Sequence, residues 1–263
     1  MLKNIYLKTL YEKRWTMFAW GLAIFLLTIL TMTFYPTLRD TFGASLKDVP
    51  DSAKAFLGDA AAYQTIEGFV DLQIFAQMVF FTIIMGVILG TGLIAGEENE
   101  GTLQTLLAMP VSRSKVYFQK LLACASIVGV VCFILFVTVI LGALLVGETM
   151  PLGRTMLACL MLWLVTLVFT ILGYSLGAVI SRRGISGAAA GMLAFVTYLI
   201  TALAPNVKVL KIPNYFSPFN YFNNPSILRN GLQLSDLAVI VAINVTLIFV
   251  GYVVFTKRDV FQR

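Results

Sequence analysis

The chain has 263 residues, of which 59% are hydrophobic and 12% are charged, and it contains no histidine. Its mean hydropathy is +0.88 and its formal net charge is +6. This composition excludes a water-soluble domain with one buried core and a polar shell, and it indicates an integral membrane protein.

Several kinds of active site are also excluded or disfavoured. No segment matches the phosphate-binding pattern G-x-x-x-x-G-K-[ST], so the chain does not hydrolyse ATP by that route. Without histidine there is no Ser-His or Cys-His pair and no H-E-x-x-H zinc site. The three cysteines lie inside apolar runs and lack metal-ligand or disulfide spacing.

The chain begins with a basic stretch, residues 1–14, followed by an uncharged apolar run at 15–35. This order resembles a signal peptide, but the run is too long and no small-residue cleavage site precedes Pro36. We therefore expect a retained first membrane span at about 15–35.

The next segment, residues 36–71, holds six acidic residues. Val49, Pro50 and Asp51 indicate a turn before a short helix at 52–57. The segment fits either a lid or an acidic, solvated connection, and the second interpretation is favoured because acidic runs usually face water.

A second uncharged run at 72–96 leads into a polar loop at 97–113, the most informative part of the sequence. Gly101 and Thr102 can begin a short helix there, and a proline at 110 ends it. Its apolar face is formed by Leu103, Leu106 and Leu107. Its start is acidic, with Glu97, Glu98 and Glu100, and the positive end of the helix dipole favours carboxylates at that position. Ser112 is placed to cap the following helix. An apolar face of this kind either lies on lipid headgroups or fills a groove on a partner, and the spacing alone does not separate the two.

Four further spans are expected, at about 116–147, 155–181, 184–206 and 235–256. The fold class is thus an all-α membrane protein with six transmembrane helices. The uncharged runs within the six spans, of which the third begins at 121 and the sixth at 237, contain no Asp, Glu, Lys or Arg, which argues against an ion-coupled transporter and suggests that energy comes from another subunit.

Small residues are concentrated in G-x-x-x-G pairs, which allow helices to approach closely in lipid. The four pairs are Gly86/Gly90, Gly92/Gly96, Gly173/Gly177 and Gly187/Gly191. The last belongs to a small-residue face that starts at Gly184, so Gly184, Gly187 and Gly191 are the candidates for packing against a second subunit. The alternative is tight packing within one subunit.

The distribution of basic residues predicts the orientation. If both termini are cytoplasmic, the inside segments carry 12 of the 19 Lys and Arg residues, as the positive-inside rule requires. The net positive charge is then a sign of membrane orientation, and no nucleic-acid partner is expected. Between the fifth and sixth spans, the aromatic residues of 215–222 suit the headgroup level and equally the exit of an amphiphilic substrate.

The motif Gly-Glu-Glu-x-Glu-Gly-Thr-Leu-x-x-Leu-Leu-x-x-Pro-Val-Ser-Arg at residues 96–113 resembles the coupling segment of the ABC-2 type permeases, the membrane subunits of ATP-binding-cassette transporters. The resemblance covers essentially the whole chain, as one permease domain over 1–263. Residues 8–14 resemble the amphipathic N-terminal helix of that family, although Lys13 interrupts the apolar face. Residues 215–231 resemble its outer re-entrant hairpin, and residues 255–259 its usual ending.

The resemblance implies a transverse coupling helix docked in a cleft of a separate ATPase. Glu97, Glu98 and Glu100 would meet basic groups of that ATPase. Leu103, Leu106 and Leu107 would fill its groove, with Gly101 and Thr102 at the helix start. Pro110 and Arg113 would fix the return into the third span.

It also implies the partners: two copies of the cytoplasmic ATPase, which would bind ATP and Mg²⁺, a second permease subunit, identical or homologous, and membrane lipid. The chain itself is expected to have no cofactor and no enzymatic activity. The expected location is a prokaryotic plasma membrane, and the expected function is export of a hydrophobic or amphiphilic compound.

Two other functions remain open at this point. One is a non-transporting component of the same type, acting in signalling, immunity or protein remodelling, which the lack of a large outer domain disfavours. The other is an intramembrane enzyme, which the lack of histidine and of membrane-embedded carboxylates disfavours.

Overall fold

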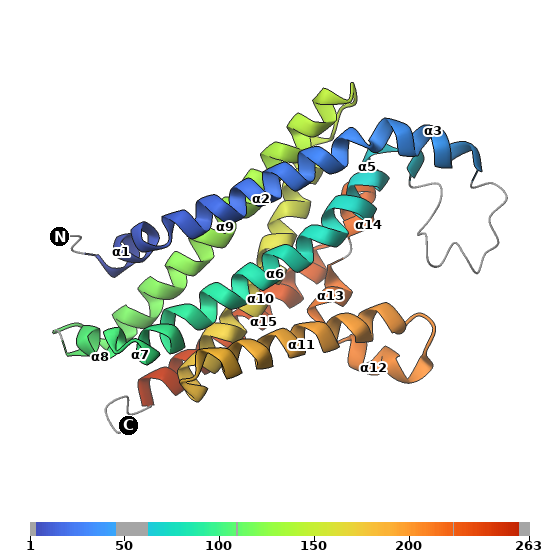
Figure 1. Cartoon of the computed structure of the whole chain (residues 1–263). Helices are drawn as coiled ribbons and strands as arrows, with labels where there is room; N and C mark the ends of the chain where they lie inside the picture. The colour runs from blue at the N-terminus through green and yellow to red at the C-terminus, as the bar shows by residue number, and fades with distance from the viewer. Residues whose placement is uncertain (1–3, 46–62, 109, 223, 258–263) are drawn as a thin grey trace.

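Six long apolar helical segments form the body of the molecule (Figure 1). The computed structural model describes residues 4–45, 63–108, 110–222 and 224–257, and these contain no strand. The candidate spans are Arg14–Thr41, Ile66–Asn99, Arg113–Leu145, Leu152–Ile180, Arg183–Leu203 and Leu234–Lys257. The prediction of an all-α chain with six spans is confirmed.

The first two spans are built from several helical pieces. The first consists of α2 (Arg14–Thr33) and the start of α3 (Tyr35–Ser45). The second consists of α5 (Ile66–Phe69), the π-helical turn η3 (Val70–Phe75), α6 (Ala76–Thr91), a second π-helical turn η4 (Gly92–Gly96) and α7 (Glu97–Asn99).

Each of the other four spans is a single helix, and short helices connect them. The four are α9 (Arg113–Leu145), α10 (Leu152–Ile180), α11 (Arg183–Leu203) and α15 (Leu234–Lys257). The short helices are α1 (Ile5–Glu12), α8 (Thr102–Leu107), η5 (Lys208–Leu210), α12 (Lys211–Asn214), α13 (Pro218–Tyr221) and α14 (Asn224–Asn230).

The central helix of the bundle is α10, which packs against α6, α9, α11 and α15, while α2 lies along α9. The span that contains α6 is the most enclosed, with 78% of its most apolar stretch buried, against 17% for α11 and for α15. A large part of α11 and α15 is therefore left to contact lipid or another protein.

Two of the G-x-x-x-G pairs mesh with one another inside this chain. A methyl group at Gly90 would overlap the backbone carbonyl of Thr170, and one at Gly173 would lie 3.4 Å from the backbone oxygen of Val87. The absence of side chains at these positions lets α6 and α10 approach closely. For these pairs the interpretation of packing within one subunit is the one that the structure supports.

The connection before the second span is shorter than we expected. Pro36 lies inside a helix, α3 continues to Ser45, and the next helix already begins at Ile66. Asp71 is 4% exposed, so the interpretation of 36–71 as one solvated acidic connection is wrong at its C-terminal end, whereas Asp40 near its start is exposed. The turn at 49–51 and the helix expected at 52–57 lie outside the described residues.

Between α11 and α15 the chain turns back onto the bundle. Phe219, Ile227 and Leu228 are buried, and α14 contacts α10, α5 and η3. Tyr215 and Phe216, by contrast, are strongly exposed. The returning path agrees with the shape of the expected hairpin, and its depth in a membrane stays a prediction.

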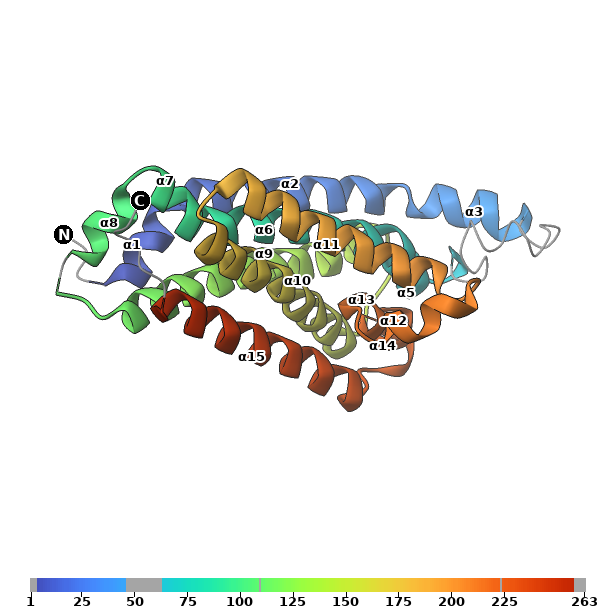
Figure 2. The same cartoon turned by 90° about the horizontal axis from the view of Figure 1, so that it is seen from below.

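The two ends of the bundle carry different elements. One, which we call the coupling end, holds α1, α7, α8 and the last turn of α15, so the two described chain ends lie on the same side as the loop at 97–113 (Figures 1 and 2). The other, the distal end, holds α3, α12 and α14. The two described chain ends and the loop thus lie on one side of the bundle, and the cytoplasmic location of that side stays a prediction.

Candidate functional site

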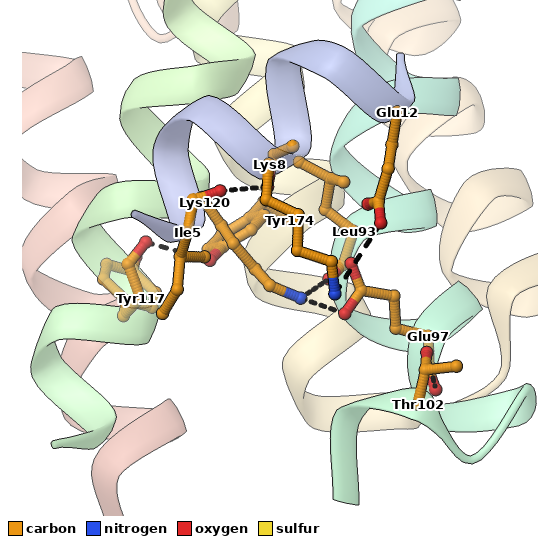
Figure 3. Close-up of polar contacts among 10 residues, drawn as sticks. Ile5, Lys8, Glu12, Leu93, Glu97, Thr102, Tyr117, Lys120 and Tyr174 are labelled. Carbon is orange, nitrogen blue, oxygen red and sulfur yellow. Dashed lines mark hydrogen bonds and ion pairs between the residues drawn. The ribbon is translucent and has the colours of Figure 1, made fainter. Parts of the chain in front are cut away.

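The loop at 97–113 folds as two short helices separated by a sharp turn. The first, α7, continues the second span, and Gly101 adopts a left-handed conformation (φ 73°) that favours glycine. Helix α8 then begins at Thr102, whose Oγ1 donates to the carbonyl of Glu97 at 3.1 Å (Figure 3). The predicted helix start is confirmed.

A buried ion pair holds the beginning of this loop. Lys120 of α9 is 1% exposed, and its Nζ donates to a carboxylate oxygen of Glu97 and, at 2.9 Å, to the carbonyl of Leu93 in η4 (Figure 3). A buried charge needs such partners. The sequence analysis missed Lys120 because the third apolar run was counted from the residue after it.

Helix α1 covers this ion pair from the side. The backbone N–H of Ile5 donates to Oε1 of Gln119, and the hydroxyls of Tyr6 and Ser126 lie 3.1 Å apart. Lys8 and Glu12 form an ion pair of 3.6 Å on α1 (Figure 3). The N-terminal helix is thus attached to α9, next to the residue that holds Glu97.

The three predicted leucines do not share one environment. Leu103 is 0% exposed within this chain, so in this conformation it offers no surface to a partner. Leu106 is partly buried against the core, and the side chain of Leu107 lies outside the described ones. The expectation that Leu103 fills a partner's groove is therefore corrected, because Leu103 is buried against its own bundle.

The glutamates also differ. Glu97 has its partner inside this chain, Glu98 is half-buried, and Glu100 is exposed. Of the three glutamates, Glu100 is the exposed one. Pro110 is exposed as well.

Two further contacts attach the loop to other spans. With its amide oriented to suit its neighbours, Asn99 donates to the carbonyl of Ser181 at 2.6 Å, where α10 ends. At the other end of the loop, Ser112 caps α9 as predicted, and Arg113 donates to the carbonyl of Thr256 in α15 at 3.4 Å. The loop is thus connected to α9, α10 and α15 as well as to its own span.

A groove of about 600 Å³ runs between α6 and α11. Its walls are apolar, with Arg183 as the charged lining residue, and Gly184, Gly187 and Gly191 line it. A methyl group would meet nothing within 4 Å at Gly184 or Gly191, and only Thr91 Oγ1 at 3.9 Å at Gly187. The small-residue face that we predicted to pack against a second subunit therefore borders open space in the single chain.

A second cavity of about 520 Å³ continues this seam toward the distal end. Phe80 and Phe219 line both cavities, and Tyr198 contacts both rings, with centroid distances of 4.7 and 5.7 Å. These three aromatic residues separate the two spaces. The distal cavity also contains Asp71, a carboxylate that the sequence analysis assigned to the outer loop.

Within the described ranges, no three His, Cys, Asp or Glu side chains gather in a group suited to a metal ion. The three cysteines are buried and are not in disulfides. The polar chemistry described above is therefore that of ion pairs and hydrogen bonds.

Comparison with protein families gives one match that covers nearly the whole chain. The family model described as ABC-2 family transporter protein matches residues 3–260. Comparison with curated proteins gives no significant match.

Proposed function

Because this chain belongs to the ABC-2 family of transporter proteins, we propose that it is the permease subunit of an exporter driven by a separate ATPase. The ATPase docks on residues 97–113, and the two permease subunits pack through α11. ATP and Mg²⁺ bind to the ATPase, of which each transporter has two copies.

The observation that carries this proposal is the set of contacts around the loop. Glu97 is held by Lys120, Asn99 by Ser181, and Arg113 by the carbonyl of Thr256. A displacement of α8 by a docked protein is therefore passed to the second, third, fourth and sixth spans together. A loop that only rested on lipid headgroups would not require connections to four spans.

The groove between α6 and α11 supports the choice of cargo. Its walls are apolar along part of α6 and part of α11, and it is followed by a second cavity beyond the aromatic cluster of Phe80, Tyr198 and Phe219. Apolar walls suit a hydrophobic or amphiphilic compound better than a hydrated ion. Export follows if the coupling end faces the cytoplasm of a prokaryotic cell, which the positive-inside rule favours.

The docking model is tested by changing Leu106, the described leucine of α8 that remains partly accessible. Leu106→Glu is expected to leave the permease in the membrane but to abolish association with the ATPase, since an unpaired charge is costly to bury in an apolar cleft. Leu106→Met is the matched control and is expected to retain association. The measurement is affinity purification from membranes in mild detergent, with identification of the bound proteins and assay of their ATPase activity.

Two results would count against the proposal. If no protein with a phosphate-binding loop purifies with the unmodified chain, the proposal of a separate ATPase that drives transport is wrong. If Leu106→Glu binds the ATPase and supports transport as the unmodified chain does, the docking site lies elsewhere.

A further inference from the structure

Asp71 is a carboxylate in an unusual place. It lies in η3, in the second membrane span, and is 4% exposed among Phe69, Val70 and Ile74, which are all fully buried. Its Oδ1 atom has no hydrogen-bond partner among the described residues. A buried carboxylate is costly unless a partner compensates it, and within a membrane span such a residue usually has a function.

Within the described residues, no cation pairs directly with Asp71. Arg229 of α14 acts electrostatically on Asp71, but no ion pair joins the two within the described part of the chain. Arg229 itself is exposed and lines a different cavity, together with Glu67 and Arg154. By contrast, the other buried charge of the spans, Lys120, has both a carboxylate and a carbonyl partner.

The surroundings of Asp71 are those of a binding site. The residue lines the distal cavity of about 520 Å³, which is within the usual range for small-molecule sites. The rest of the wall is apolar and aromatic, with Phe80, Tyr198, Phe219 and Phe222 contributing rings and Thr201 a hydroxyl. A carboxylate together with aromatic rings is the combination that binds organic cations, through charge and through cation–π attraction.

The local backbone also departs from a regular helix at this point. Both π-helical turns of the second span lie next to a buried ionisable group: η3 contains Asp71, and η4 supplies the carbonyl of Leu93 to Lys120. Such turns are frequent at functional sites. Lys120, beside η4, forms an ion pair with Glu97. Asp71, in η3, forms no ion pair with any described residue.

We propose that the distal cavity binds a lipophilic organic cation, with Asp71 as its counter-ion and the aromatic residues around its apolar part. Binding itself requires only this chain. The further conclusion that such cations are the transported compounds rests on the proposed function.

The test uses two probes of the same shape and opposite charge, tetraphenylphosphonium and tetraphenylborate, with the purified full chain in lipid nanodiscs and no ATP. The unmodified chain is expected to bind the cation with a preference over the anion that exceeds that of empty nanodiscs. Asp71→Asn, which keeps the shape and removes the charge, is expected to weaken cation binding at least about tenfold and not to weaken anion binding. Glu67→Gln is the matched control. Glu67 lies on the same span but lines the cavity that contains Arg154 and Arg229, so this variant is expected to bind the cation as the unmodified chain does.

Three results would overturn the inference: equal binding of the two probes, unchanged cation binding by Asp71→Asn, or equal loss in Glu67→Gln. Asp71→Glu, which keeps the charge, is expected to recover part of the affinity, so a fault in folding is separable from loss of the counter-ion. If cation binding fails while an ATPase still purifies with the chain, the inference falls and the transporter proposal stands. If the cation binds and no ATPase associates, the inference stands and the transporter proposal is wrong.

Discussion

At the scale of single residues, the most consequential feature is the ion pair between Lys120 and Glu97. The two members are not equally buried, with side-chain exposures of 2% and 21%. When one partner of a buried pair is removed, the cost depends on whether the remaining charge can reach water. The two single substitutions are therefore not equivalent.

We expect Glu97→Gln to destabilise the protein more than Lys120→Met. The first leaves a nearly inaccessible ammonium group with only the carbonyl of Leu93 and a neutral amide, at a cost of about 3 kcal/mol, while the second leaves a carboxylate that water can reach, at a cost of about 1 kcal/mol. The free energy of unfolding in mixed detergent micelles measures both. The double variant is expected to be more stable than Glu97→Gln alone, and equal losses from the two single variants would contradict this account.

Two buried charged residues, Asp71 and Lys120, show what the sequence did not reveal. An apolar run is counted until the first charged residue, so Asp71 and Lys120 fell just outside runs that began at 72 and 121. In the structure, the helices extend beyond these runs and bury both residues. The partner of Lys120 lies 23 residues away in the sequence, and no local pattern identifies it.

At the scale of the elements, local rules predicted helices well and their partners poorly. The lengths of the apolar runs identified six spans, and the cap at Ser112 and the start at Thr102 follow from side-chain chemistry near the helix ends. Periodicity also identified the apolar face of α8, but the same spacing fits a face turned inward or outward. Leu103 is turned inward, and only the tertiary structure shows it.

The glycines allow a test of which helix faces pack closely within the chain and which are open. Gly90→Ala is expected to destabilise the protein by about 1–3 kcal/mol or to prevent folding, because the new methyl group would overlap the backbone of α10, which cannot move aside. Gly191→Ala, in the open groove, is expected to be neutral or to stabilise α11 by up to about 1 kcal/mol. Thermal unfolding of the two variants in the same detergent makes the comparison, and similar melting temperatures would show that α6 and α10 are not so closely packed.

At the scale of the whole molecule, the single chain is complete on some sides and open on others. The bundle around α10 is closely packed, while α11 leaves a groove lined by glycines and presents large apolar side chains beyond it. Lipid can cover exposed side chains of any helix, but a row of small residues is the pattern of helix–helix contact. A second permease subunit on this face remains our prediction.

Crosslinking in native membranes tests that assembly. Gly184→Cys is expected to form disulfides between two permease chains, against little background because the native cysteines are buried. Gly191→Leu in the same chain is expected to abolish the product, since the larger side chain has room within one chain but not between two. Val245→Leu, on the exposed surface of α15, is the control that should leave crosslinking intact. Undiminished crosslinking in the Gly191→Leu chain would place the interface elsewhere.

The connection between α10 and α11 sets a limit on how the groove opens. Only Ser181 and Arg182 separate the two helices, so three Cα–Cα steps join Ile180 to Arg183 and keep these helix ends within about 11 Å of each other. The first turn of α11 therefore stays next to α10, and α11 can move away from the bundle only by a rotation about the joint at Ser181. The carbonyl of Ser181 accepts a hydrogen bond from the side-chain amide of Asn99. A displacement of the loop at 97–113 thus acts close to the joint at Ser181. A small rotation there moves the distal end of α11, which lies beside Asp71, over a larger distance.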